Sequence, residues 1–381
     1  MNSSQSFVRN WALAALAAVC VVGCNSGDGT SELEASRAAY AERNFKDANK
    51  LANKAVKRSK GSIDAYVQSA RVKLALGYLD EGRKATAAAL KLDEHASDAL
   101  LLEAKIAYHQ KDYATAMLDF RHIADDPSYL PEERSDALEG IGVVQMSVNE
   151  FEQARVALLR AIRLNRRNAA AWYHLGLLYR DGFGFQATAM EQFQFYVHLA
   201  DQNDSRVQRV RDSYIPDLKE TLDRKAATAR GVAERDSEKG AQLLQEGDQL
   251  LAKNQPKNAK AKYAAALKAD PLNYKAAIAL AQVTPKVDKT PEGAKAQLKA
   301  YRVACALQPS NTQLLITTAD LAFRLNFQAT ALELYSRALA TNPVDLNALD
   351  GLVKCIKKVG GKQEVAAAYE AYRAELAARR K

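Results

Sequence analysis

Residues 172–179 read Trp-Tyr-His-Leu-Gly-Leu-Leu-Tyr, and this stretch decides the fold of the chain. Ala189 and Phe193 follow it after a short segment that contains Gly182 and Gly184. The aromatic side chains recur here at helical spacing, which is more typical of a packed helix face than of a ligand site. The stretch therefore predicts two helices that cross at small residues, with a tight turn between them.

The pattern resembles the signature of the tetratricopeptide repeat, W-x-x-L-G-x-x-Y followed by Ala and then Phe. One extra residue in the turn Gly182-Phe183-Gly184-Phe185 displaces the last two signature positions by one place. The resemblance implies helical hairpins that must stack, because one hairpin cannot bury its own apolar face. The signature residues expected in the repeat cores are Trp172, Leu175, Gly176, Tyr179, Ala189, Phe193, Ala259, Tyr263, Ala331 and Tyr335.

Prolines mark the period of the repeat, because proline ends a helix. Pro309 and Pro343 lie 34 residues apart, which is the length of this repeat. Pro271 and Pro309 lie 38 residues apart. The difference predicts a four-residue insertion, which we place between Thr284 and Pro291.

The resemblance implies an all-α fold, a right-handed superhelical solenoid of helical hairpins in two groups. We expect roughly five repeats over residues 33–200 and roughly four over residues 238–375, with a basic tail at 376–381. Residues 201–237 break the pattern and predict a charged helical linker, with a long helix from about 217 that runs into the second group. We interpret this helix as a solvated spacer, and a hinge is the alternative.

The first residues predict export. Trp11 to Val22 is an apolar run that is shorter than the roughly 20 residues of a membrane span, and it fits the core of a signal peptide. Val21-Val22-Gly23-Cys24 resembles the bacterial lipobox, which implies a signal peptide over 1–23 and acylation of Cys24 with fatty acids such as palmitate. The polar residues after Cys24 predict a flexible tether over 24–32. The alternative is an ordinary secretory signal with a chance cysteine.

The lipobox resemblance also implies a location. Asn25, rather than Asp, follows Cys24, which points to the outer membrane with the protein facing the periplasm. The formal charge of +9 falls to +8 without residues 1–23, because Arg9 is the only charged residue there. This balance favours acidic partners such as anionic lipid headgroups or glycans, and we expect no nucleic acid.

Residues that could take part in catalysis or metal binding are few and scattered. The five histidines lack a His-Glu-x-x-His pairing, and there is no Cys-x-x-Cys, so we expect no enzyme, no cofactor and no metal. Residues 182–187 match the dinucleotide fingerprint G-x-G-x-x-A, but a helix precedes them where the fingerprint needs a strand. The exported compartment permits a disulfide between Cys305 and Cys355, although we expect unpaired core thiols.

In tetratricopeptide proteins the first helix of each repeat supplies ligand contacts on the concave face. The resemblance implies that partner contacts in this chain come from Arg71, Lys105, Tyr108, Met146, Tyr173, Leu177 and Arg180. This mixture of apolar and cationic groups would suit an extended peptide or a helix with acidic residues.

Two further basic stretches stand out. One holds Arg155, Arg160, Arg163, Arg166 and Arg167, and the other holds Lys50, Lys54 and Lys57. We interpret both as solvated helix faces, and an anion-binding stripe is the alternative.

Together these features predict a non-enzymatic, lipid-anchored scaffold for protein–protein interaction in the bacterial cell envelope. It would assist the assembly of an envelope machine, such as a pilus, a secretion system or exopolysaccharide export. The alternative is a module that binds anionic polysaccharide, and a regulatory subunit of an enzyme is a third possibility.

Overall fold

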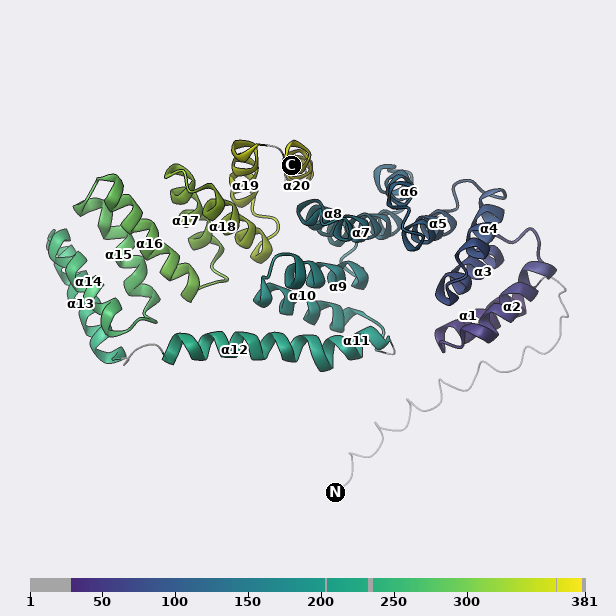
Figure 1. Ribbon diagram of the computed structural model, residues 1–381, viewed down its shortest axis with the longest axis horizontal. Coiled ribbons are helices and arrows are strands. Elements are labelled where there is room, and N and C mark those ends of the chain that lie inside the picture. The colour runs from purple at the N-terminus through teal and green to yellow at the C-terminus, as the bar shows by residue number, and fades with distance from the viewer. Residues whose placement is uncertain (1–28, 203, 232–235, 361, 379–381) are drawn as a thin grey trace, which may run out of the picture. The chain divides into compact units, whose positions relative to one another are not determined.

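The computed structural model describes residues 29–202, 204–231, 236–360 and 362–378, and every regular element in these ranges is a helix (Figure 1). The all-α prediction is therefore confirmed. None of the described helices combines the length and the apolar composition that a membrane crossing needs. The contacts divide the chain into two compact units, with the division between Gln110 and Lys111.

Unit 1, which ends at Gln110, contains the first helices of the chain. They are α1 (Thr30–Ala41), α2 (Phe45–Arg58), α3 (Ile63–Leu76), α4 (Leu79–Leu90) and α5 (Ser97–His109).

Unit 2 starts at Lys111 and continues the series with paired helices. They are α6 (Tyr113–Asp125), α7 (Pro131–Ser147), α8 (Phe151–Leu164), α9 (Ala169–Leu177), α10 (Gln186–Leu199), α13 (Ser237–Ala252), α14 (Pro256–Ala269), α15 (Tyr274–Val287), α16 (Pro291–Leu307), α17 (Thr312–Arg324), α18 (Gln328–Thr341), α19 (Leu346–Val359) and α20 (Gln363–Ala378). The compact units do not follow the two predicted repeat groups, because helices of both groups lie in unit 2. The boundaries of those groups stay a prediction.

The turns between paired helices show the repeat in the backbone itself. Arg43, Gly77 and Lys111 have positive φ angles of 62°, 77° and 65°, and they follow one another at intervals of 34 residues. A positive φ returns at Asn149, Gly184, Asn254, Asn326 and Gly360. One residue in this conformation turns the chain from the first helix of a pair into the second.

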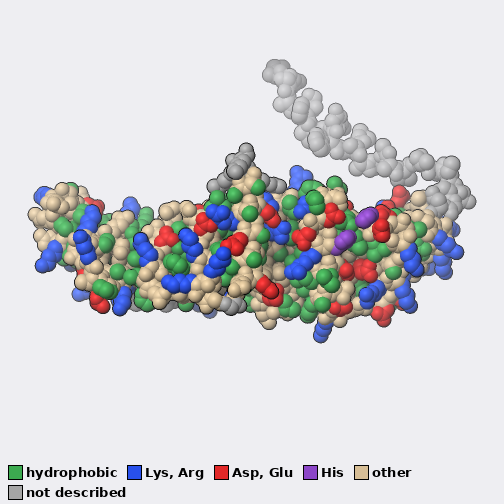
Figure 2. Space-filling view, turned by 90° about the horizontal axis from the view of Figure 1, so that it is seen from above, with side chains coloured by type: hydrophobic (Ala, Val, Ile, Leu, Met, Phe, Trp, Pro, Cys, Tyr) green, Lys and Arg blue, Asp and Glu red, His purple; other side chains and the backbone are tan. Residues whose placement is uncertain are grey.

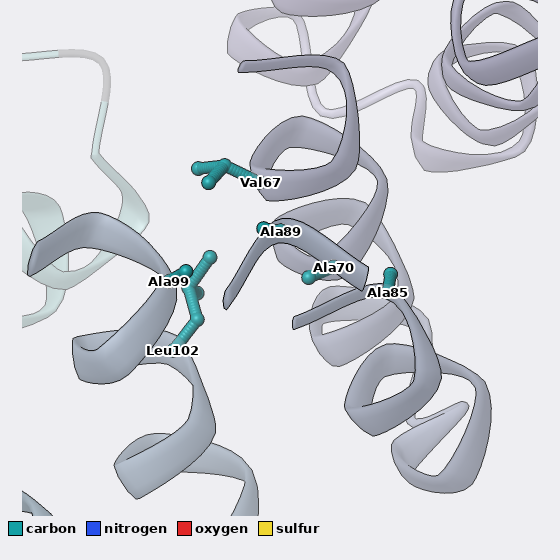
Figure 3. Packing of buried hydrophobic residues seen from close by; sticks show 6 residues of the cluster. All are labelled: Val67, Ala70, Ala85, Ala89, Ala99 and Leu102. Carbon is teal, nitrogen blue, oxygen red and sulfur yellow. The ribbon is translucent and has the colours of Figure 1, made fainter. Parts of the chain in front are cut away.

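Small residues let the helices of unit 1 pack closely. Ala70 of α3, Ala89 of α4 and Ala99 of α5 are fully buried, and Val67 and Leu102 fill the space beside them (Figure 3). A core built from alanines has little room for larger side chains, so it fixes the distances between helices.

In unit 2, glycines allow aromatic side chains to pack against the helix backbone. A Cβ atom on Gly176 would lie 2.6 Å from Cε1 of Phe193, and one on Gly351 would lie 2.2 Å from Cε1 of Tyr335. The missing side chain therefore allows the helix backbone to rest directly on an aromatic ring. Tyr179 and Ala189 of the signature stretch are also fully buried.

The extra residue of the signature stretch lies in a different place from the one we predicted. The end of the first helix forms a π-helical turn, η1 (Leu178–Gly182), which accommodates one residue more than an α-helical turn. The following turn therefore needs only Gly184 at a positive φ of 71°. The insertion is absorbed mainly in the helix, and the prediction that placed it in the loop was wrong.

The linker helix also differs from the prediction. Helix begins at α11 (Ser205–Arg209), continues through the π turn η2 (Val210–Tyr214), and ends with α12 (Ile215–Gly231). It does not run into the next helix, because Asp236 has a non-helical backbone conformation and starts α13 separately. The Asp236 side chain accepts a hydrogen bond from the Lys239 amide (2.8 Å), and its own amide donates to the Ala269 carbonyl (2.9 Å).

Candidate binding surfaces

Arg155 of α8 is fully buried in unit 2 and joins helices that are distant in sequence. Its Nε donates to the Tyr369 hydroxyl (2.7 Å), and its Nη1 donates to the carbonyl (3.2 Å) and hydroxyl (2.7 Å) oxygens of Ser336. Its Nη2 donates to Oε2 of Glu152 (2.6 Å). The guanidinium also lies 4.7 Å from the centroid of the Phe183 ring. One side chain thereby ties α8 to α18 and α20.

The electrostatics of this cluster keep Arg155 charged and its tyrosines neutral. Burial would lower the pKa of Arg155, but Glu152 and the nearby tyrosine hydroxyls outweigh burial and raise that pKa. Burial is also the main cause that raises the pKa of Tyr369 well above its usual value, although Arg155 opposes this shift. Burial likewise raises the pKa of Tyr179 to about 12. The buried ion pair is therefore satisfied by hydrogen bonds on several sides.

Two more arginines of α8 bind α20. Arg160 Nη2 lies 2.8 Å from Oε1 of Glu375, and Arg163 pairs with the same carboxylate. Only Arg166 and Arg167 of the basic stretch are exposed. The interpretation of the whole stretch as a solvated helix face was wrong, because its partners come from α20, about 200 residues later in the chain. No local pattern in the sequence marks such a distant partner.

The residues predicted as partner contacts in unit 2 have different surroundings. Tyr173 is only 8% exposed and packs on Tyr196, with 5.0 Å between the ring centroids. Arg180 pairs with Asp181 (2.7 Å) and lies 4.0 Å from the centroid of the Tyr214 ring. Because Tyr214 belongs to η2, the chain itself occupies this part of the predicted contact face. Met146 and Leu177 remain partly exposed.

The residues predicted in unit 1 keep more of their surface. Arg71 of α3 is 37% exposed and lies 3.7 Å from Asp98 of α5. Lys105 and Tyr108 of α5 are both partly exposed. The contacting helices α3 and α5 thus place Arg71, Lys105 and Tyr108 in one unit.

A cleft that the sequence did not reveal lies between α16 and α18. It has a volume of about 570 Å³, and three cations at i, i+4 and i+7 of α16 line it. Lys295 lies 3.9 Å from Glu292, while Lys299 and Arg302 have no ion-pair partner among the described residues. We call this the α16–α18 groove. Its remaining lining is mostly apolar: Leu298, Val303, Ala306, Phe327 and Thr330.

Phe327 is 41% exposed, although phenylalanine side chains are most often buried. The groove thus combines an apolar surface with positive charge. Elsewhere, Lys and Arg side chains are spread over the face in Figure 2, with acidic side chains among them.

The described residues contain no group of three or more His, Cys, Asp and Glu side chains arranged to hold a metal ion. Cys305 and Cys355 are buried free thiols. Burial raises the pKa of Cys355 to about 11, and it also raises the pKa of Cys305, so both thiols are poor nucleophiles at neutral pH. Cys24, the predicted lipidation site, lies outside the described residues.

Helix pairs with a 34-residue turn spacing define a helical repeat protein. Residues 67–129, 140–194 and 244–283 match the tetratricopeptide-repeat family. Tetratricopeptide repeats are therefore found in these three stretches, and the second of them contains the signature stretch that predicted the repeat.

A comparison with solved structures finds similarity to several proteins. PilF of Pseudomonas aeruginosa is 20% identical over 52% of this chain and 91% of its own, with a TM-score of 0.40. MamA of Desulfovibrio magneticus RS-1 is 18% identical over 47% and 98%, with a TM-score of 0.34. YrrB, described as a TPR protein with an unusual peptide-binding site, is 14% identical over 48% and 91%, with a TM-score of 0.31. No curated protein matches the chain in sequence.

Proposed function

We propose that the protein is a non-enzymatic scaffold that binds other proteins in the bacterial cell envelope. A lipid on Cys24 anchors it, in the outer membrane and facing the periplasm, and it assists the assembly of a machine such as a pilus, a secretion system or an exopolysaccharide exporter. Tetratricopeptide repeats generally mediate protein–protein interaction, which supports the first part of this proposal.

The observation that carries the proposal is the α16–α18 groove. Its cations lie beside an exposed aromatic ring, and apolar side chains line the space between them. An amphipathic helix with acidic residues would bury its apolar side on Val303 and Phe327, and its carboxylates would meet Lys299 and Arg302. Complementary charge gives such a contact its orientation and its speed of association.

The face of Arg71, Lys105 and Tyr108 in unit 1 is a second proposed contact for the same class of partner. Tyr173 and Arg180 are left out of this proposal, because the chain's own helices already contact them.

Photocrosslinking in cells tests the groove. A photoreactive residue at position 327 should give one discrete protein adduct, and mass spectrometry should map it to an acidic amphipathic segment. Lys299→Glu with Arg302→Glu should abolish the adduct. The matched control, Lys275→Glu with Lys354→Glu, reverses two exposed cations elsewhere in unit 2 and should preserve it. Adducts with abundant bystanders alone would contradict the scaffold.

Anionic polysaccharide is the competing ligand for the same cations. Binding of such a polymer should weaken steeply with salt, and Lys299→Glu with Arg302→Glu should weaken it further. If this result appears without any protein adduct, the polysaccharide-binding alternative replaces the scaffold.

Cell fractionation tests the anchor separately. Cys24→Ser should leave the protein unlipidated and move it from the membrane to the soluble fraction. Tight membrane retention of this variant would contradict lipid anchoring.

A further inference from the structure

We propose that four lysines of α2 form a face that rests on anionic lipid headgroups. Lys46, Lys50, Lys54 and Lys57 make up this surface, which we call the lysine face. The proposal rests on the proposed lipid anchor, because it explains how the first helices of an anchored protein would lie against the membrane.

The helix geometry gathers the four lysines on one side. At about 100° per residue, they fall within roughly 80° of the circumference of α2. Ala48, Ala52 and Ala55 lie on the opposite side and are fully buried in unit 1. The helix therefore directs its positive charge away from the rest of the unit.

The lysines have no competing partner. All four are exposed, and among the described residues none of them forms an ion pair or a side-chain hydrogen bond. The other charged groups of α2 are engaged, since Arg58 pairs with Glu32 and Asp47 accepts a hydrogen bond from Asn44 (2.7 Å). The positive charge of the face is thus available to an external anion.

The start of the described chain lies at the basic end of the same helix. Gly29 packs on the last turn of α2 so closely that a Cβ atom there would lie 2.9 Å from the Ala55 carbonyl and 3.1 Å from Cβ of Arg58. Gly29 follows Cys24 by five residues. Even a fully extended segment of this length spans only about 18 Å. An acylated Cys24 therefore keeps the end of α2 that carries Lys54 and Lys57 within reach of the lipid surface.

A lysine that lies near an anionic membrane strengthens the binding of the protein to that membrane. A lysine close to an anionic membrane surface strengthens binding by about 5-fold, and the effect fades beyond a screening distance of roughly 8 Å. Together with the acyl chains, the lysine face would fix the orientation of the first helix pair on the membrane.

Vesicle co-sedimentation tests the lysine face without the anchor. The probe is the secreted chain without residues 1–24, mixed with phosphatidylcholine vesicles that contain or lack phosphatidylglycerol. We expect binding only to the anionic vesicles, and we expect salt to weaken it. Changing all four lysines to glutamine should lower the partition coefficient by roughly 600-fold, about 5-fold for each lysine.

A matched variant controls for net charge. Lys219, Lys253, Lys275 and Lys354 are exposed lysines of unit 2, and changing these four to glutamine removes the same charge. This control should keep most of the vesicle binding. Equal loss in both variants, or unchanged binding of the α2 variant, overturns the proposal. Circular dichroism melting confirms that both variants are folded.

The outcomes of the two membrane tests are independent. Loss of anchoring in the Cys24→Ser variant concerns the lipid, whereas the vesicle experiment concerns the lysine face alone. If the lysine face does not bind anionic vesicles, the proposals for the lipid anchor and for the α16–α18 groove are unaffected.

Discussion

Helices α2 and α8 are both rich in cations, yet the chain uses them in opposite ways. The lysines of α2 are exposed and have no ion-pair partner in the part of the chain that the structure describes, whereas Arg155, Arg160 and Arg163 of α8 bind residues of α18 and α20. Arginine suits the second role, because its planar guanidinium has five donors for several fixed partners. The ammonium of lysine is strongly hydrated and suits a surface. The role of a basic helix face in this protein therefore depends on which residues from distant parts of the sequence pack against it.

The largest effect is expected from breaking the buried cluster of α8. Arg155→Met leaves Glu152 and Tyr369 without their cation and should destabilise unit 2 by about 3 kcal/mol. Urea unfolding measures this, and Trp172 is a convenient fluorescent reporter because the other tryptophan, Trp11, lies in the predicted signal peptide. Arg166→Met changes an exposed arginine near the same helix and should cost little. A loss below about 1 kcal/mol for Arg155→Met would mean that the cluster does not hold the helices together.

The same cluster predicts alkaline sensitivity of unit 2. Tyr179 has its pKa raised to about 12 in the folded chain, above the usual value of 10. Between pH 10 and pH 12 the unfolded chain loses this proton while the folded chain keeps it, so unfolding is favoured as the pH rises. The stability contributed below pH 10 should fall by about 2–3 kcal/mol across this window.

Unfolding free energies measured from pH 8 to pH 12 check this prediction. Tyr179→Phe should reduce the fall, because the substituted ring has no proton to lose. An equally steep fall in this variant would assign the alkaline sensitivity to other groups.

Closing the space at a glycine tests the packing of the last helix pairs. Gly351→Ala places a Cβ atom 2.2 Å from the Tyr335 ring and should lower stability by about 1–3 kcal/mol. Gly61→Ala is the control, since an added Cβ meets no atom within 4 Å there. Equal melting temperatures for the two variants would show that the Tyr335 ring can move aside.

The smallest effect on stability is expected from α2. Changing Lys46, Lys50, Lys54 and Lys57 to glutamine should shift the unfolding free energy by no more than about 0.5 kcal/mol for each position. Denaturant titration of unit 1 measures this. A larger loss would reveal internal partners for these lysines and would remove the contrast with α8.

The sequence predicted the local parts of this structure well. The spacing of Leu175, Gly176 and Tyr179 predicts a helix whose buried side meets a second helix, because such contacts repeat at helical intervals. Pro309 and Pro343 likewise give the length of the repeat. These features depend on residues within one repeat, so a single chain displays them.

The distant and irregular parts could not be predicted in the same way. Arg155 looks like any other arginine of a basic stretch, because Ser336 and Tyr369 approach it only in the folded chain. The π turn η1 and the break at Asp236 depend on local hydrogen bonds that the composition does not specify. The α16–α18 groove was missed because its lining joins two helices whose patterns are unremarkable when each is read alone.

Side-by-side photocrosslinking in cells tests the central claim most directly. The full-length acylated protein would carry a photoreactive residue either at position 50 on the lysine face or at position 327 in the α16–α18 groove. A membrane-bound scaffold predicts lipid adducts from position 50 and one discrete protein adduct from position 327, which Lys299→Glu with Arg302→Glu removes. Protein adducts from position 50, or only abundant bystanders from position 327, would contradict the account.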